Sequence, residues 1–374
     1  MRRTKYTILL LLLPLSLLAY DFQAGHLFYS ILSEQEVEVT YEYPDAVKLY
    51  KRLRKLTIPA QVSDSDHIYQ VVGIGRRAFH DCTKLRRISL PSTLRYIDSA
   101  ALAELSSLDS LTLPDSLRRI GDEAFYRCTS LSYIDIPASV DSIGEQVFIG
   151  CTKLRRMSVA AENARYDSRQ NCNGIIEKAT GRLFATCTRT TLPDTLRWID
   201  TQAFAYRSNI EEAFIPKGVK TIGYAAFAGC VELKTVTLPS TLDSLGEWAF
   251  YGCQSLKYID LTEGLKTIPY NCFAECNDLR EVTLPMSVDS LAKRAFYFSG
   301  IRIARLNNVR YIGASCFDGC RFLHSLYLSS NIEYIEPTAL DNCTALERIC
   351  IPVGQRKRIK KMIPKYYHKI IYEQ

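Results

Sequence analysis

The side chains in this sequence best suited to chemistry are its 13 cysteines, which could bind zinc or act as nucleophiles. Two pairs, Cys272 with Cys276 and Cys316 with Cys320, have a C-x3-C spacing. A zinc site would need a second pair of cysteines or histidines at a suitable distance. None of the five histidines is so placed, and none has a carboxylate or cysteine partner at a catalytic spacing. These residues therefore predict no metal site, no cofactor and no enzyme.

A repeated stretch accounts for most of the cysteines. The segment RRIGDEAFYRCTSLSYIDIP at residues 118–137 returns as VKTIGYAAFAGCVELKTVTLP at 219–239 and as LDSLGEWAFYGCQSLKYIDLT at 242–262. Neighbouring copies are 23 residues apart, except for one step of 21 and one of 56. The eleven copies begin at Ile74, Ile97, Ile120, Ile143, Ile199, Ile222, Leu245, Ile268, Leu291, Ile312 and Ile335. Such a period predicts one elongated solenoid, in which each copy packs only against its neighbours.

Eight of the cysteines share one slot of the repeat, eight positions after the leading apolar residue. They are Cys82, Cys128, Cys151, Cys230, Cys253, Cys276, Cys320 and Cys343. Cysteine is among the most buried residue types and packs as a small hydrophobe. Two copies carry Leu105 and Arg207 in this slot, a tolerance that a shell of metal ligands would not have. The eight thiols are therefore predicted to form a structural ladder in the core.

Each copy also contains a short apolar-x-apolar stretch that predicts a β-strand, such as LSYIDIP at residues 131–137. Proline lacks a backbone N–H, so Pro137 and its equivalents mark the point where strand pairing stops. The AF-x-x-C segment is compatible with a short helical turn on the opposite side of the coil. One strand per copy, stacked in register, predicts a parallel sheet along one face of an α/β solenoid.

The residues that flank the buried strand residue are predicted to point outward. An ordinary solvated sheet, rich in Thr and Ser, explains about half of them. Exposed aromatic residues and Arg among charges are typical of binding surfaces. The candidate partner-binding residues are Tyr133, Asp135, Arg156, Glu212, Phe214, Tyr258, Asp260, Glu281 and Tyr327. Ser325 and Cys350 occupy equivalent positions and are also predicted to point outward.

The N-terminus has the pattern of a secretory signal, with three basic residues before an apolar core at residues 8–18. That core is shorter than the roughly 20 residues that a membrane span needs. We expect a signal peptide at residues 1–19 with cleavage after Ala19 or Ala24, an exported protein and no later membrane span. An uncleaved anchor is the alternative.

The positive charge of the chain is local. Removing the three basic residues of the signal lowers the formal charge from +7 to +4, and residues 353–374 carry seven Lys or Arg against one Glu. The remainder is close to neutral, which predicts no general affinity for nucleic acid. The basic tail fits a segment that binds polyanions or, as we prefer, a terminal cap in which Ile359, Met362 and Ile363 pack on the last coil.

The recurring pattern IGxxAFxxCxxLxxIxLPxxLxx resembles the BspA-like class of bacterial leucine-rich repeats over about residues 72–353. The resemblance implies a right-handed coil with a β-rich N-terminal cap at residues 20–71 and a basic helical cap at 354–374. It also implies a secreted or surface-exposed protein that binds macromolecules and is not a catalyst.

An insertion at about residues 160–190 interrupts the repeats, and it resembles another regular element of the family. Its segment GIIEKATGRLFATC, residues 174–187, predicts a strand, a turn at Thr180-Gly181 and a second strand. In an exported protein, Cys172 and Cys187 could form a disulfide across this insertion. The copy at Leu102 and the copy two residues short, which starts at Leu291, depart from the pattern and are expected to kink the coil.

The predicted function is an adhesin-like module of the bacterial surface that binds another protein, such as a matrix, host or bacterial surface protein. A glycan-binding accessory protein and a structural component of the envelope are the alternatives. The sequence leaves open whether the protein resides at the outer surface, in the medium or in the periplasm.

Overall fold

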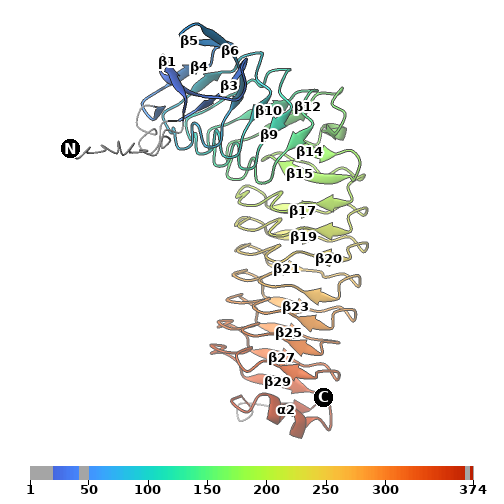
Figure 1. Cartoon of the computed structure of the whole chain (residues 1–374). Helices are drawn as coiled ribbons and strands as arrows, with labels where there is room; N and C mark the ends of the chain where they lie inside the picture. Colours follow the sequence, from blue (N-terminus) through green and yellow to red (C-terminus); the bar gives the residue numbers. More distant parts are fainter. Residues whose placement is uncertain (1–19, 42–49, 367–370, 374) are drawn as a thin grey trace, which may run out of the picture.

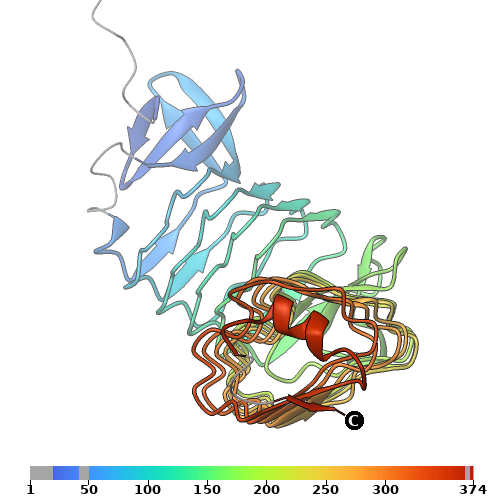
Figure 2. The same ribbon diagram turned by 90° about the horizontal axis from the view of Figure 1, so that it is seen from below.

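The computed structural model describes residues 20–41, 50–366 and 371–373, which form a long solenoid with a bend (Figure 1). The predicted signal peptide, residues 1–19, lies outside the described residues. The bend lies at the insertion and separates an N-terminal arm, residues 50–160, from a C-terminal arm, residues 196–366. Seen along the C-terminal arm, the coils of that arm overlie one another and the N-terminal arm leads away from them (Figure 2).

The N-terminal cap is built from β-strands, as the resemblance implies. Strand β2 (Leu27–Ile31) pairs with β1 (Phe22–Ala24) and β3 (Glu36–Thr40), and β6 (His67–Ile74) pairs with β3 and β5 (Gln61–Asp64). The end of β6, at Gly73 and Ile74, also pairs in parallel with Tyr96 and Ile97 of the solenoid. The cap therefore passes into the coil without a break.

The cap allows a prediction for the signal cleavage site. Ala24 lies inside β1, where Phe22 is buried and stacks on Tyr29 with ring centroids 5.2 Å apart. The ring of Tyr20 contacts Phe28 at 4.6 Å. Cleavage after Ala24 would remove these contacts, so we expect the mature protein to begin at Tyr20. N-terminal sequencing of the exported protein checks this, and a first residue of Gly25 would contradict it.

The coil begins one turn earlier than the eleven copies predict. Strand β4 (Lys55–Thr57) pairs in parallel with β7 (Arg87–Ser89). Leu56 of β4 is buried, as is Ile88, the strand residue of the next copy with which it pairs. The ring of Tyr50 lies 4.9 Å from that of Phe79, where a preceding phenylalanine would lie. The first turn has no AF-x-x-C segment, and for that reason the repeat pattern missed it.

Every copy except the one that begins at Ile97 contributes two strands, not the single strand predicted. The expected strands form the strand face of the solenoid. They are β7, β10 (Tyr133–Ile136), β12 (Arg156–Val159), β17 (Glu212–Phe214), β19 (Thr235–Thr237), β21 (Tyr258–Ile259), β23 (Glu281–Thr283), β25 (Ile303–Arg305), β27 (Ser325–Tyr327) and β29 (Arg348–Ile351).

A second parallel ladder of strands runs along the solenoid. Each of its strands has two residues, the second of which is the leading apolar residue of a copy. Its strands are β8 (Tyr96–Ile97), β9 (Arg119–Ile120), β11 (Ser142–Ile143), β16 (Trp198–Ile199), β18 (Thr221–Ile222), β20 (Ser244–Leu245), β22 (Thr267–Ile268), β24 (Ser290–Leu291), β26 (Tyr311–Ile312) and β28 (Tyr334–Ile335). Two-residue strands are too short to show an alternating pattern in the sequence.

The third side of each coil is made of tight turns rather than the helical turns predicted. These turns contain residues with positive φ, such as Glu123 and Trp248. The phenylalanine N–H then donates to the next coil, as from Phe227 to the carbonyl of Ala249 at 2.8 Å. From residue 51 to the C-terminal cap, the described residues contain no α-helix. The "α" of the predicted α/β class is therefore wrong for the repeats.

Two internal ladders hold the coils in register. Six phenylalanine rings of the C-terminal arm stack with centroids 4.8–5.5 Å apart and interplanar angles of 3–12°. They are Phe204, Phe227, Phe250, Phe273, Phe296 and Phe317. Beside them lie the ladder cysteines, all of them buried. Cys253 Sγ, for example, donates to the carbonyl of Phe227 at 3.2 Å. The predicted structural role of these thiols matches their burial.

The short copy does not kink the coil as expected. The rings on both sides of it remain stacked, because Phe296 lies 5.5 Å from Phe273 and 5.4 Å from Phe317. One residue is missing before Ile301 and one before Val309, so both deletions fall in turns. At Gly300 a Cβ atom would lie only 1.9 Å from the carbonyl oxygen of Asn277. Glycine is thus what lets the shortened turn pass close to the preceding coil.

The insertion forms the predicted hairpin. Strand β14 (Gly174–Glu177) pairs antiparallel with β15 (Arg182–Thr186), and Gly181 between them has a φ of +67°. A shorter strand, β13 (Tyr166–Asp167), pairs with β14, and β15 pairs in parallel with β16. The buried apolar residues form two separate clusters, one on each side of this insertion. The bend therefore coincides with a break in the hydrophobic core.

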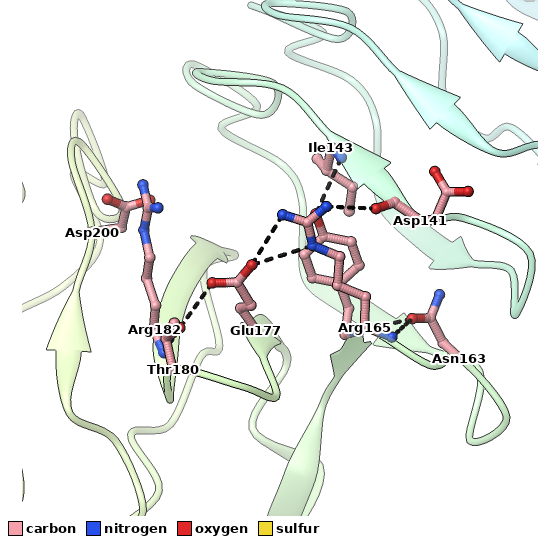
Figure 3. Close-up of polar contacts among 9 residues, drawn as sticks. Asp141, Ile143, Asn163, Arg165, Glu177, Thr180, Arg182 and Asp200 are labelled. Carbon is pink, nitrogen blue, oxygen red and sulfur yellow. Dashed lines mark hydrogen bonds and ion pairs between the residues drawn. The ribbon is translucent and has the colours of Figure 1, made fainter.

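Polar contacts fix the hairpin between the two arms (Figure 3). Arg165 donates to Glu177 Oε1 from Nε at 3.2 Å and from Nη2 at 3.1 Å, and its Nη1 donates to the carbonyl of Asp141 at 2.9 Å. On the other side, Arg182 forms an ion pair of 2.5 Å with Asp200. These contacts tie the insertion to the last coil of one arm and the first coil of the other.

The C-terminal cap consists of helix α2 (Arg356–Met362) and strand β30 (Ile371–Glu373), which pairs in parallel with β29. Ile359 and Ile363 are buried against the last coil. Lys357, Arg358 and Lys361 are exposed. One short helix and one strand thus follow the last coil, and these basic residues of the helix face solvent.

Candidate binding surface

The strand face carries all nine candidate binding residues, but on three separate sheets. Tyr133, Asp135 and Arg156 lie on the β10–β12 pair of the N-terminal arm. Glu212, Phe214 and Tyr258 lie on β17–β19–β21, with Asp260 directly after β21. Glu281 and Tyr327 lie on the sheet that begins at β23. The insertion divides the predicted stripe between β12 and β17, and strand pairing is also interrupted between β21 and β23, so the stripe is not continuous.

Phe214 and Tyr258 are the most exposed aromatic residues of this surface, at 68% and 56%. Glu212 pairs with Thr235, which pairs with Tyr258, and Phe214 pairs with Thr237. Phe214 and Tyr258 are therefore two strands apart, or about 10 Å across the sheet. Within the described chain, neither ring has an aromatic or cation–π partner. Both rings are open to an incoming surface.

The other aromatic candidates are already engaged by arginines. The guanidinium of Arg156 lies 5.1 Å from the ring centroid of Tyr133, and Arg156 also pairs with Asp135 at 2.9 Å. The guanidinium of Arg305 lies 5.0 Å from the ring of Tyr327 and forms an ion pair with Glu281. These groups form paired polar clusters, each of which a partner would have to open or cover.

Two hollows mark the strand face near its ends. One of about 460 Å³ is lined by Arg305, Asn307, Tyr327 and their neighbours on β27 and β29. The other, of about 360 Å³, is lined by Arg87, Ser110 and neighbouring residues of the N-terminal arm. Both are open depressions lined by polar and apolar groups in similar measure, and the residues that line them include no cluster suited to catalysis.

Ser325 and Cys350 do not point outward as predicted, since both are buried, at 5% exposure each. Ser325 lies between Ile303 and Arg348 across the sheet. Cys350 lies beside Tyr327 in the sheet. The longer neighbouring residues account for the burial of these two small side chains. At the C-terminal end of the strand face, fewer side chains are therefore exposed for binding than the sequence predicts.

The structure has Cys172 and Cys187 as free, buried thiols. Cys172 Sγ donates to the carbonyl of Gly174 at 3.6 Å, whereas Cys187 Sγ accepts from the N–H of Arg189 at 3.5 Å. The two residues belong to different core clusters. The disulfide considered from the sequence is not present here.

Burial also determines the chemistry of the ladder thiols. It raises the pKa of Cys151 to about 11 and that of Cys82 to about 12. A protonated, buried thiol is neither a nucleophile nor a metal ligand. Across the described ranges, no group of three or more His, Cys, Asp or Glu side chains is arranged to hold a metal ion.

Two features of the surface and core were missed from the sequence. The second ladder exposes its own aromatic residues, Trp198, Tyr311 and Tyr334, at 39–47%. Tyr311 and Tyr334 stack with centroids 5.9 Å apart. These residues directly precede the leading apolar residues, which would have been the signal. The second feature is Arg207, which is only 4% exposed at the bend.

Comparison with known families decides how this solenoid is classified. A family model described as the BspA type leucine-rich repeat region matches residues 50–176, 178–302 and 299–363. The chain belongs to the BspA-type leucine-rich repeat family. The match begins at residue 50, where the structure begins its first coil. BspA-type repeats are scaffolds of bacterial surface proteins and are generally not catalytic.

Solved structures similar to this BspA-type protein share its fold. A leucine-rich repeat protein from Eubacterium ventriosum is 20% identical with a TM-score of 0.70, covering 85% of this chain and 93% of that one. The pneumococcal vaccine antigen PcpA is 16% identical with a TM-score of 0.56, covering 94% and 98%. A leucine-rich cell surface protein from Faecalibacterium prausnitzii is 22% identical with a TM-score of 0.50, covering 91% and 97%. Comparison with curated proteins gives no match.

The BspA-type chain contains no helix, among the residues described, that is long and apolar enough to cross a membrane.

Proposed function

We propose that this protein is an exported surface protein that binds another protein through the strand face of its C-terminal arm, as an adhesin-like module without catalysis. The observation that carries the proposal is the pair of exposed, unpartnered rings of Phe214 and Tyr258 on a rigid sheet. Large aromatic residues on rigid elements dominate the energy of protein interfaces.

The surroundings of these two rings indicate the chemistry of the partner. Glu212 and Asp260 are exposed beside them, while Thr235 and Thr237 lie on the strand between. An apolar centre with acidic residues at its edge is complementary to an apolar patch surrounded by Lys or Arg. We therefore expect a protein partner with a basic rim around an apolar contact.

Two further observations support an exported location. The N-terminal segment has the composition of a secretory signal. Among the similar structures, PcpA is described as a pneumococcal vaccine antigen and the Faecalibacterium protein as a cell surface protein. An adhesin-like role agrees with both descriptions.

Replacing both rings tests the proposal. The double variant Phe214→Ser and Tyr258→Ser is expected to weaken binding to a protein partner by at least about 30-fold, which is the effect of losing about 2 kcal/mol from a single hot-spot side chain. The melting temperature should change little, because both side chains are exposed. Binding is measured with mature protein on arrayed extracellular-matrix and bacterial surface proteins at physiological salt, followed by titration of each hit.

A matched control distinguishes binding at this surface from nonspecific binding through any exposed aromatic residue. Tyr224 is exposed by 45% on the turn side of the same arm, so Tyr224→Ser should leave the affinity unchanged. Equal loss in both variants, or no loss in the double variant, contradicts the proposal. Hits confined to a glycan array would assign the protein to the glycan-binding class instead. If the protein binds heparin and the double variant Lys357→Gln and Lys361→Gln does not, the binding site is the basic C-terminal cap.

A further inference from the structure

The joint between the two arms contains a small cavity that neither the repeats nor the strand face explains. Within an arm, the ladder phenylalanine donates to the next coil, as from Phe125 to the carbonyl of Val147 at 3.1 Å. At the joint, β15 lies between the last coil of one arm and the first coil of the other. A cavity of about 30 Å³ remains there, with Phe148, Thr186 and Gln202 among its lining residues.

A buried charge closes this cavity from the C-terminal arm. Arg207 occupies the slot of a ladder cysteine and is 4% exposed. Its Nη1 donates to the carbonyl of Cys151 at 2.7 Å, and its Nη2 donates to those of Phe148 at 3.3 Å and Thr186 at 2.5 Å. Two of these carbonyls belong to the last coil of the N-terminal arm, and the third belongs to β15 of the insertion. No carboxylate in the described chain forms an ion pair with Arg207, so its charge is compensated only by dipoles.

Three buried polar atoms without a hydrogen-bond partner belong to residues that line this one cavity. They are Arg182 Nε, Gln202 Oε1 and Arg207 Nε. The other unpartnered buried side-chain atoms of the described residues are scattered over Asn271, Ser287, Arg294 and Gln355. An unpaired buried polar group is costly, so three around one cavity point to a group that they share.

The charges around the cavity determine the kind of group. Arg182 is neutralised by Asp200 (Figure 3), whereas Arg207 has no such partner. Glu145 also lines the cavity but is exposed to solvent, where its charge is screened. The buried side chains thus carry one net positive charge. The two guanidinium Nε atoms are donors, and the amide of Gln202 can turn to offer its NH2 as a third.

We propose that this cavity binds one small monovalent anion of halide size, held by Arg182, Gln202 and Arg207. Its volume is about twice the roughly 10–15 Å³ that a single water needs, which is too small for a phosphate or a sugar. The anion would bind residues of the hairpin and of the C-terminal arm against the last coil of the N-terminal arm. It therefore binds only the assembled joint and stabilises the angle between the arms.

The test uses mature protein and chloride itself. Chloride-35 nuclear magnetic resonance is expected to show protein-dependent line broadening that saturates with one class of site. Bromide should reverse it, and methanesulfonate, which is too large for the cavity, should not. Replacing sodium methanesulfonate by sodium chloride at constant ionic strength should raise the melting temperature by roughly a few degrees.

Two variants decide whether the effect belongs to this cavity. Gln202→Glu places a carboxylate beside the two arginines, in a slot where Glu123 has the same positive φ in another copy. It should abolish both the broadening and the chloride dependence without loss of stability. Arg294→Gln, the control, removes a similar unpartnered buried Nε atom elsewhere and should preserve both.

Absence of broadening in the wild-type protein, or broadening that persists in Gln202→Glu, overturns the proposal. A crystal soaked in bromide provides an independent decision. An anomalous peak between Arg182, Gln202 and Arg207 supports the anion, and density for water alone at that place refutes it.

Discussion

Raising the pH above about 9 is expected to unfold this protein, although its ion pairs and backbone ladders change little between pH 7 and 9. Burial raises the pKa of the ladder thiols, to about 11 for Cys151 and about 12 for Cys230, from an ordinary value of 9.0. The same cause raises the pKa of the remaining ladder thiols. Below pH 9 a thiol is neutral in both states, and the stabilising effect of its burial is complete. Between 9 and the folded pKa only the unfolded chain releases its proton, so stability falls as the pH rises.

The number of thiols makes this effect large. By pH 10 each ladder thiol has lost more than about 1 kcal/mol of its contribution, and the eight together have lost roughly 10 kcal/mol. That is comparable to the free energy of unfolding of many whole domains, which is about 5–15 kcal/mol. Burial also raises the pKa of Tyr29 and Tyr251 to about 12, with the same sign, but their contribution is lost only above pH 10.

Urea unfolding followed by circular dichroism at a series of pH values, under reducing conditions, measures this effect. The urea midpoint should fall steeply from pH 8.5 to 10. The variant Cys253→Ala is the control: it is less stable at pH 7, but its loss between pH 8 and 10 should be smaller by about 1 kcal/mol because one thiol is gone. A midpoint that stays constant up to pH 10, or thiols that ionise near 9 in the folded protein, would contradict the expectation.

Truncating one ring of the phenylalanine ladder is expected to be the most damaging single substitution. Phe250 is fully buried and stacks on Phe227 at 5.3 Å and on Phe273 at 5.5 Å. Phe250→Ala removes contacts with both neighbouring coils and leaves a cavity that the stacked backbone cannot close. Replacements of this type cost about 3–5 kcal/mol.

The protein itself supplies the control for this prediction. Leu102 fills the same slot between the coils of Phe79 and Phe125 and is also fully buried. Phe250→Leu should therefore cost less than Phe250→Ala, about 1.5 kcal/mol or below. Because each coil contacts only its neighbours, hydrogen exchange should increase in the coils around Phe250 and not in the N-terminal arm. Equal costs for the two variants, or faster exchange in β10 and β12, would be evidence against the ladder as the source of stability.

Most of the solenoid could be predicted from the sequence because its slots repeat. Phe and Cys recur at fixed positions, so their burial follows from the period alone, and the hairpin at Gly181 follows from its turn residues. The second ladder could not be predicted, since a two-residue strand such as Tyr311–Ile312 leaves no alternation to detect. The first coil was missed because Tyr50 fills its ring slot without the neighbouring AF-x-x-C pattern.

The candidate site was only partly predictable for a different reason. Alternation along a strand indicates which side a residue faces, but not whether its neighbours cover it. Ser325 and Cys350 face outward by position and are buried by longer residues beside them. Arg207 differs from these two residues. It is buried, as its slot in the repeat predicts, but the element that it contacts is the insertion and not another repeat. Its contacts exist only because the insertion interrupts the repeats there, and the repeat pattern does not describe that interruption.

The identical slots also make the length of each arm adjustable in fixed steps. Adding one 23-residue copy would repeat every ladder once and extend an arm by one strand spacing, about 4.8 Å. Neither the caps nor the joint would need to change, since each coil contacts only the coils next to it. The distance between the bend and the rings of Phe214 and Tyr258 would stay the same if copies were added near the C-terminus. Added copies would therefore set how far the C-terminal cap lies from the bend without moving the two rings that we propose as the binding surface.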